Sequence, residues 1–198
     1  HRVDRRQRQM CIRDRDILHK SEEELMQLKA AGLDMVYMGI ESGDPQVLKD
    51  VKKGVTREEM IEAGRKLKRC GILCSATLIS GLGGRQRLRE HAIASASLIS
   101  AIKPDYVGFL TLMIDPQAPV YSKIVSGELE LLNPEDVVEE MKLFLQNVDS
   151  EGTVFRSNHA SNYVILKGTL NEDIPSMLAY LRQVEEQGKY REERWRRF

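Results

Sequence analysis

Three stretches of the sequence place carboxylates, hydroxyls and glycines directly after a short apolar run. The run at 35–40 leads into ESGD, the run at 72–79 into SGLGG, and the run at 106–114 into DPQAP. A carboxylate accepts hydrogen bonds from an ammonium group or from ribose hydroxyls, and glycines allow a ligand to approach the backbone closely. These residue types predict a ligand-binding site.

A fourth polar group, SNHASNY, follows an apolar stretch at 153–156. Its candidate substrate-binding residues are Asn158, His159 and Asn162. His159 could act as an acid, a base or a donor to a substrate, and a structural, hydrogen-bonded histidine is an equally good interpretation. The group lacks HxxE or HxxxH spacing, so we do not expect it to bind a metal ion.

The cysteines form no recognisable metal or disulfide pattern. Cys11 is isolated, and an odd number of cysteines fits a reducing compartment better than a secreted disulfide scaffold. Cys70 and Cys74 are spaced as in CxxxC, but Thr77 stands where a third cysteine would follow. Both lie where a predicted helix ends and a predicted strand begins, so we interpret them as small buried hydrophobic residues.

Strands and helices alternate along the sequence and position these groups. Ser21 with Glu24, and Thr56 with Glu59, match the capping box that begins a helix. The predicted strands are 35–40, 72–79, 106–114 and 153–156, and the predicted helices cover 21–32, 45–51, 56–71, 85–102, 133–148 and 175–186. This alternation predicts a parallel sheet, and the apolar runs predict strands buried on both faces. Because the carboxyl ends of parallel strands share one edge, we expect the polar groups to meet there.

The long connection between the third strand and the next helix, 115–132, is unusual for a compact domain. Connections of this length predict a functional lid or a substrate loop.

Composition limits the classes of partner. The chain has 198 residues, and its 30 Lys and Arg balance its 30 Asp and Glu, so no global charge favours nucleic acid or an anionic membrane. No apolar run reaches the roughly 18 to 20 residues that a membrane span needs. We expect a cytoplasmic protein with neither a membrane nor a nucleic-acid partner.

Both ends of the chain are rich in arginine and lack an apolar pattern. Residues 1–15 are expected to be a non-native or disordered arm, and the ending EERWRRF to be a frayed charged tail.

Taken in order, GIESGDPQVLKDVKKGVTREEM, LKRCGILCSATLISGLGG and DYVGFLTLM followed by DPQAPVY resemble the later half of the radical S-adenosylmethionine (radical SAM) core domain. The resemblance covers about residues 20–125. It implies an α/β fold: a partial (β/α) barrel with parallel strands, truncated at its N-terminus, plus a small C-terminal extension. The barrel part would cover residues 16–130, and an extension of helix, strand and helix would cover residues 131–198.

The resemblance also implies a function. Radical SAM enzymes bind S-adenosylmethionine (SAM) and a 4Fe-4S cluster, and cleavage of SAM starts hydrogen abstraction by a 5′-deoxyadenosyl radical. The cluster motif CxxxCxxC is not in this sequence. We therefore expect its cysteines upstream in a full-length enzyme that has an electron donor and an unknown substrate, and we expect this chain alone to be inactive. The alternative is a barrel-like nucleotide or cofactor binding module without redox chemistry.

Matching positions give the cofactor-binding candidates. In the family, the residue at Glu41 lies beside SAM, Lys53 could pair with the SAM carboxylate, and Ile79 would pack on adenine. Glu41 could instead be an acid that favours a helix N-terminus, Lys53 a solvated charge, and SGLGG a phosphate-binding turn. The complete set of candidates is Glu41, Ser42, Gly43, Lys53, Ile79, Gly81 and the backbone near Leu112.

Overall fold

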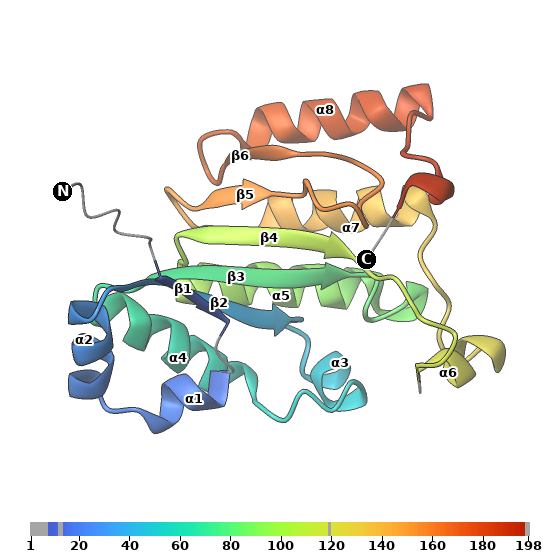
Figure 1. Ribbon diagram of the computed structural model, residues 1–198. Coiled ribbons are helices and arrows are strands. Elements are labelled where there is room, and N and C mark those ends of the chain that lie inside the picture. Colours follow the sequence, from blue (N-terminus) through green and yellow to red (C-terminus); the bar gives the residue numbers. More distant parts are fainter. Residues whose placement is uncertain (1–7, 12–13, 119, 197–198) are drawn as a thin grey trace.

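The computed structural model describes residues 8–11, 14–118 and 120–196, which form one six-stranded sheet with helices packed along one face (Figure 1). The strands follow the chain in spatial order, so each strand pairs with the next. Their bounds are β1 (Arg8–Cys11), β2 (Leu33–Glu41), β3 (Leu73–Ser80), β4 (Tyr106–Thr111), β5 (Val154–Arg156) and β6 (Lys167–Thr169).

Helices connect the strands. They are α1 (Asp14–His19), α2 (Glu22–Ala30), α3 (Pro45–Asp50), α4 (Arg57–Arg69), α5 (Leu88–Ile102), α6 (Tyr121–Val125), α7 (Pro134–Asn147) and α8 (Ile174–Gln187), with 3-10 turns η1 (Arg85–Arg87) and η2 (Glu193–Trp195). Of these, α2, α3, α4, α7 and α8 begin within a residue or so of their predicted starts, whereas α1 and α6 were not predicted. Ser21 and Thr56 each form the predicted capping box, which pairs backbone N–H groups that a helix start leaves open. None of these helices is both long and apolar enough to cross a membrane.

The sheet is parallel from β1 to β5, and β6 runs antiparallel to β5. It does not close, because β1 and β6 form its two edges. The predicted α/β fold with a parallel, partial-barrel sheet is therefore confirmed.

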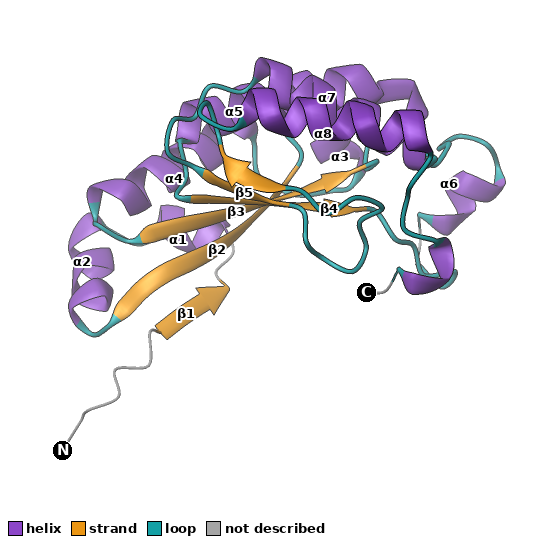
Figure 2. Cartoon of the chain, turned by 90° about the horizontal axis from the view of Figure 1, so that it is seen from above, coloured by secondary structure: helices purple, strands orange, loops and turns teal. Residues whose placement is uncertain are grey.

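One face of the sheet is covered by helices and the other is open, which corrects the prediction of strands buried on both faces. Val36, Met38 and Ile40 of β2 are fully buried, whereas Met35 before them and Tyr37 between them are only partly buried. β3 and β4 show the same alternation. Figure 2 shows α4, α5, α7 and α8 on one side of the sheet. We call the uncovered side the open face.

The core continues from the predicted barrel part into the predicted extension. Phe109 of β4, Phe144 of α7 and Phe155 of β5 pack together with ring centroids 5.5 to 5.9 Å apart. All three are buried. The division between 16–130 and 131–198 stays a prediction, because both parts contribute to one sheet and one core.

The structure differs from the expected disorder at both ends. Within 1–15, Arg8–Cys11 forms β1, which pairs with β2, and α1 begins at Asp14; the other residues up to 13 lie outside the described ones. Near the C-terminus, Arg196 is only 8% exposed. Neither segment has the apolar periodicity from which strands and helices are predicted. β1 is an edge strand that pairs only with β2, and the C-terminal tail is held by the charged side chain of Arg196.

Candidate functional site

The carboxylate of Glu41 lies over the open face at the end of β2. Glu41 has φ of 69°, which folds its side chain back over Gly39. A Cβ at Gly39 would stand 2.7 Å from Glu41 Oε1, so a larger residue there would displace the carboxylate from this position. Lys53 Nζ donates to the carbonyl oxygen of Gly39 and lies 3.3 Å from Glu41 Oε1. The fold thus brings together two of the predicted cofactor-binding residues as an ion pair.

Ser42 and Gly43 serve the local fold instead of facing the open side. Ser42 is fully buried, and its hydroxyl accepts from the N–H of Asp44, which caps α3. Gly43 donates its N–H to Ser95 Oγ at 2.9 Å, and a Cβ there would overlap the Ala94 carbonyl. These two residues therefore hold the start of α3 against α5.

A second group of candidates lines a hollow at the carboxyl ends of β3 and β4. This rim hollow has a volume of about 350 Å³, and its lining includes Gly81, Leu112, Tyr121 and Leu132. Gly81 has φ of 82°, a conformation that favours glycine. Tyr121 and Leu132 belong to the long connection, which therefore forms one wall, as a substrate loop or lid would.

The rim hollow does not include Glu41 in its lining. We expected Glu41, Gly81 and the backbone near Leu112 to line one concavity, and the structure brings only the last two together. Ile79 is not in the lining of the rim hollow either; it lies on the open face beside Leu110 of β4, next to Leu78, the register partner of Glu41. A β-bulge between Gly39 and Glu41 shifts the register at the end of β2.

A buried carboxylate that the sequence analysis missed supports the turn at Gly81. Glu140 of α7 is fully buried and accepts hydrogen bonds from Ser80 Oγ and from the Gly81 N–H, the latter at 2.9 Å. Its other oxygen lies 2.8 Å from His91 Nδ1. A charged residue between Val137 and Phe144, on the apolar side of a predicted helix, is the signal that could have revealed it.

The C-terminal tail closes one side of the rim hollow. Arg196 donates to the carbonyl oxygens of Ser161 and Leu112, at 2.6 and 3.1 Å, and its guanidinium lies 3.9 Å from the ring centre of Tyr163. Burial, together with the hydrogen bond to Glu193, raises the pKa of Tyr163 to about 12. Burial alone would raise the pKa of the Glu193 carboxyl, but hydrogen bonds from Arg196 and Tyr163 outweigh it and lower that pKa.

The three candidate substrate residues have different surroundings. Asn162 is buried, donates to the Phe109 carbonyl at 2.7 Å and accepts from Thr111 Oγ1 at 2.9 Å, so it fastens the loop after β5 to β4. His159 and Asn158 are exposed instead. The Ser161 N–H donates to His159 Nδ1 at 3.2 Å, which leaves Nε2 as the N–H of a neutral ring.

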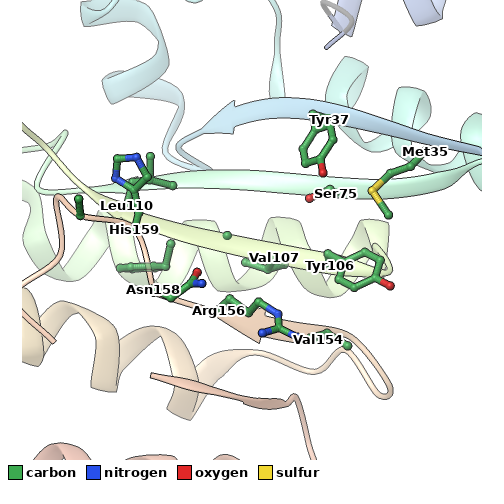
Figure 3. A pocket seen from close by; sticks show the side chains of 13 residues that line it. Met35, Tyr37, Ser75, Tyr106, Val107, Leu110, Val154, Arg156, Asn158 and His159 are labelled. Atoms are coloured by element: carbon green, nitrogen blue, oxygen red, sulfur yellow. The ribbon is translucent and has the colours of Figure 1, made fainter. Parts of the chain in front are cut away.

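Asn158 and His159 line a larger hollow on the open face, which Figure 3 shows from close by. This face hollow has a volume of about 740 Å³. Its floor is formed by β2 to β5, with Tyr37, Ser75 and Arg156 among the side chains that line it.

The cysteines of the described part do not fit an iron-sulfur cluster. Cys70 and Cys74 are buried in the hydrophobic core, which confirms their interpretation as buried hydrophobic residues, and burial raises the pKa of the Cys70 thiol. Among the described residues, no three His, Cys, Asp or Glu side chains are grouped so that they could hold a metal ion. We therefore assign no described residue to a cluster.

Comparisons with known proteins agree with this arrangement. Residues 4–93 match the model of the Radical SAM superfamily. A protein of Methanocaldococcus jannaschii named as a methylthiotransferase is 34% identical over 70 residues, which are 35% of this chain and 16% of that protein.

Solved structures share the fold over most of the chain. The archaeal Elp3 of Methanocaldococcus infernus, with residues 1–46 deleted, aligns with a TM-score of 0.63 at 21% identity and covers 91% of this chain and 42% of that one. The radical SAM methyltransferase TsrM of Kitasatospora setae, with tryptophan and a SAM analogue bound, aligns with a TM-score of 0.57 at 15% identity, over 91% of this chain and 45% of that one.

The chain therefore spans less than half the length of each of these relatives. Similarity at such low identity shows the fold alone, whereas the family model matches the sequence itself. Residues 4–93 of this chain are similar in sequence to the radical SAM superfamily.

Proposed function

We propose that this chain is a SAM-binding part of a radical SAM enzyme. The observation that carries the proposal is the ion pair of Glu41 and Lys53, held over Gly39 on the open face at the carboxyl end of a parallel strand. Ligands of parallel α/β proteins bind at this end of the strands. The matched family segment includes all three residues.

Glu41 and Lys53 would each bind one of the two charged groups of the methionine part of SAM, its ammonium and its carboxylate. Glu41 would accept from the ammonium or a ribose hydroxyl, and Lys53 would pair with the carboxylate. Gly81 and the carbonyl of Leu112 would bind the nucleoside end, with Ile79 packed on the adenine. For that, Leu112 would exchange the hydrogen bond from Arg196 for one from the ligand.

When bound and reductively cleaved, SAM would supply the 5′-deoxyadenosyl radical for hydrogen abstraction from a substrate. The residues described here would bind and orient the cofactor. The electron donor and the substrate of the whole protein belong to the same proposal, as does a 4Fe-4S cluster held by cysteines outside the described residues.

Binding of SAM to the chain tests the role of Glu41. We expect Glu41→Gln to weaken SAM binding by about tenfold or more in isothermal titration calorimetry, because hydrogen bonds to charged groups contribute about 1.5 to 3 kcal/mol. Glu58→Gln is the matched control, since Glu58 is exposed on α4. Equal affinity of the two variants would remove Glu41 from the site.

The redox part of the proposal needs a separate assay. The full-length protein would be reconstituted anaerobically with iron and sulfide, reduced in the presence of SAM and assayed for 5′-deoxyadenosine. SAM binding without formation of 5′-deoxyadenosine would favour a non-redox cofactor-binding module instead.

A further inference from the structure

Gly108 lies in the middle of β4, where the backbone gives no reason for a glycine. Its φ is not positive, in contrast to several other glycines of the chain. A Cβ built at Gly108 would meet no atom closer than 3.9 Å, so packing does not exclude a side chain either. A glycine inside a strand weakens it and often marks a place where a ligand approaches the backbone.

The strand register places Gly108 in a bare row across the open face. Gly39, Thr77, Gly108 and Arg156 are neighbours on β2, β3, β4 and β5. Gly39 and Gly108 have no side chain, and Thr77, which lies between them, has a small one. The Glu41 carboxylate occupies the space over Gly39, so the row leaves room over Gly108, and Arg156 lies beside Gly108 at the end of the row.

The side chain of Arg156 is an exposed cation, and the described residues supply no hydrogen bond or ion pair to its guanidinium. Other described arginines, such as Arg57, Arg85 and Arg87, each bind a neighbouring side chain. The residues that line the face hollow around Arg156 include no Asp or Glu.

Three residues that line the face hollow carry hydroxyl groups, which can donate hydrogen bonds, and of these Tyr106 lies on the strand next to Arg156. Tyr37, Ser75 and Tyr106 are neighbours in the adjacent row, two residues along each strand, and they line the same hollow (Figure 3). A cation with hydroxyl groups and no acid nearby attracts an anion. A planar guanidinium binds a carboxylate or phosphate through two parallel hydrogen bonds.

We propose that the face hollow is the substrate site and that Arg156 binds a carboxylate or phosphate group of the substrate lying over Gly108. As a substrate site it rests on the proposed function, whereas the anion site itself does not. The hollow is separate from the rim hollow, where the nucleoside end of SAM is proposed to bind, since the two share no lining residue.

Binding of simple anions to the chain tests this site. The probes are inorganic phosphate and malonate, titrated into the nitrogen-15-labelled chain and followed by NMR at the Gly108 amide and the Arg156 Nε–H. We expect saturable shifts at Gly108 with both probes, and about tenfold weaker binding in Arg156→Gln, because hydrogen bonds to charged groups contribute about 1.5 to 3 kcal/mol. Arg156→Lys is expected to bind both probes more tightly than Arg156→Gln but more weakly than the unmodified chain. Lysine keeps the positive charge but cannot form the two parallel hydrogen bonds of a guanidinium.

Two matched variants make the outcome decisive. Arg182→Gln removes an exposed arginine of α8 and should leave the affinity unchanged. Gly108→Val should fold, because the position is open, and should weaken malonate binding by filling the bare row. Unchanged affinity in Arg156→Gln, or shifts that do not reach Gly108, would overturn the proposal.

The same samples separate this inference from the proposed function. Arg156→Gln should bind SAM as the unmodified chain does. If the chain binds phosphate through Arg156 but does not bind SAM, the proposed function fails and the anion site stands. If SAM binds and Arg156→Gln leaves anion binding unchanged, the anion site fails and the proposed function stands.

Discussion

Glu41, the residue that we propose binds SAM, has a backbone conformation that costs the fold some stability. A residue other than glycine with positive φ is uncommon and is held by its surroundings. Here the surroundings are Lys53, which contacts both the Glu41 carboxylate and the Gly39 carbonyl. The carboxylate is therefore fixed before any ligand arrives, which lowers the entropy that binding would have to overcome.

Tyr163 provides a test of the packing around the C-terminal tail. Its pKa is raised to about 12, so in the folded chain the hydroxyl keeps its proton more strongly than in the unfolded chain. The resulting stabilisation is complete below the ordinary tyrosine pKa of about 10 and is lost as pH rises through about 12. We expect the difference in absorbance at 295 nm between the unmodified chain and Tyr163→Phe to titrate with a midpoint near 12.

An ordinary midpoint for Tyr163, near that of exposed tyrosines, would show that the tail does not cover it. Tyr180 serves as the comparison, because it is 43% exposed on α8. Tyr180→Phe should leave the transition of Tyr163 near 12 in place.

At the scale of elements, Glu140 joins α7 to the end of β3. Glu140→Ala would leave the donors of Ser80 and Gly81 buried without their acceptor. Because each unpaired buried donor costs about 1 to 3 kcal/mol, we expect the free energy of unfolding to fall by about 3 kcal/mol in a denaturant titration. Hydrogen exchange at the Gly81 amide should become faster than at the amides of the central strands.

Glu139→Ala is the matched control for Glu140→Ala. Glu139 is the neighbouring residue on α7 and is 49% exposed, with an ion pair to Lys142. Exposed pairs of this kind contribute about 0 to 1 kcal/mol. If both variants lost the same stability, the buried hydrogen bonds of Glu140 would not be what holds the Gly81 turn.

The elements that the sequence predicted share a strong local signal. Capping residues and apolar periodicity identified β2, β3, β4, α4, α5 and α7, because each of these elements has its own pattern. β6 was missed because a strand of three residues at an edge, KGT, has neither length nor alternation. α1 was also missed, because it has only six residues and the apolar residue that it buries, Ile17, follows several charged residues.

The candidate site was predictable in its residues but not in its geometry. The strand-end groups at Glu41, Gly81 and Leu112 were visible in the sequence. Their division between the open face and the rim hollow depends on a β-bulge and on a positive φ at Glu41, which no local pattern encodes. Arg156 was equally hidden, because its importance comes from the register of four strands.

At the scale of the whole molecule, the predicted barrel part depends on the predicted extension. Phe109 packs on Phe144 and Phe155, and α7 lies against α5. We expect a chain that ends at residue 130 to lack a cooperative thermal transition in near-ultraviolet circular dichroism, whereas the 198-residue chain shows one. A truncated chain that unfolds cooperatively would instead establish 16–130 as an independent domain.

The reversed direction of β6 has a consequence for how this sheet can be enlarged. A further strand connected through a helix adds parallel to its neighbour, and β6 presents the opposite polarity to β5 on that side. The edge at β1 still presents the polarity shared by five strands. A strand that ran in the direction shared by β1 to β5 would therefore pair in parallel at the β1 edge, whereas at the β6 edge it would pair in antiparallel fashion.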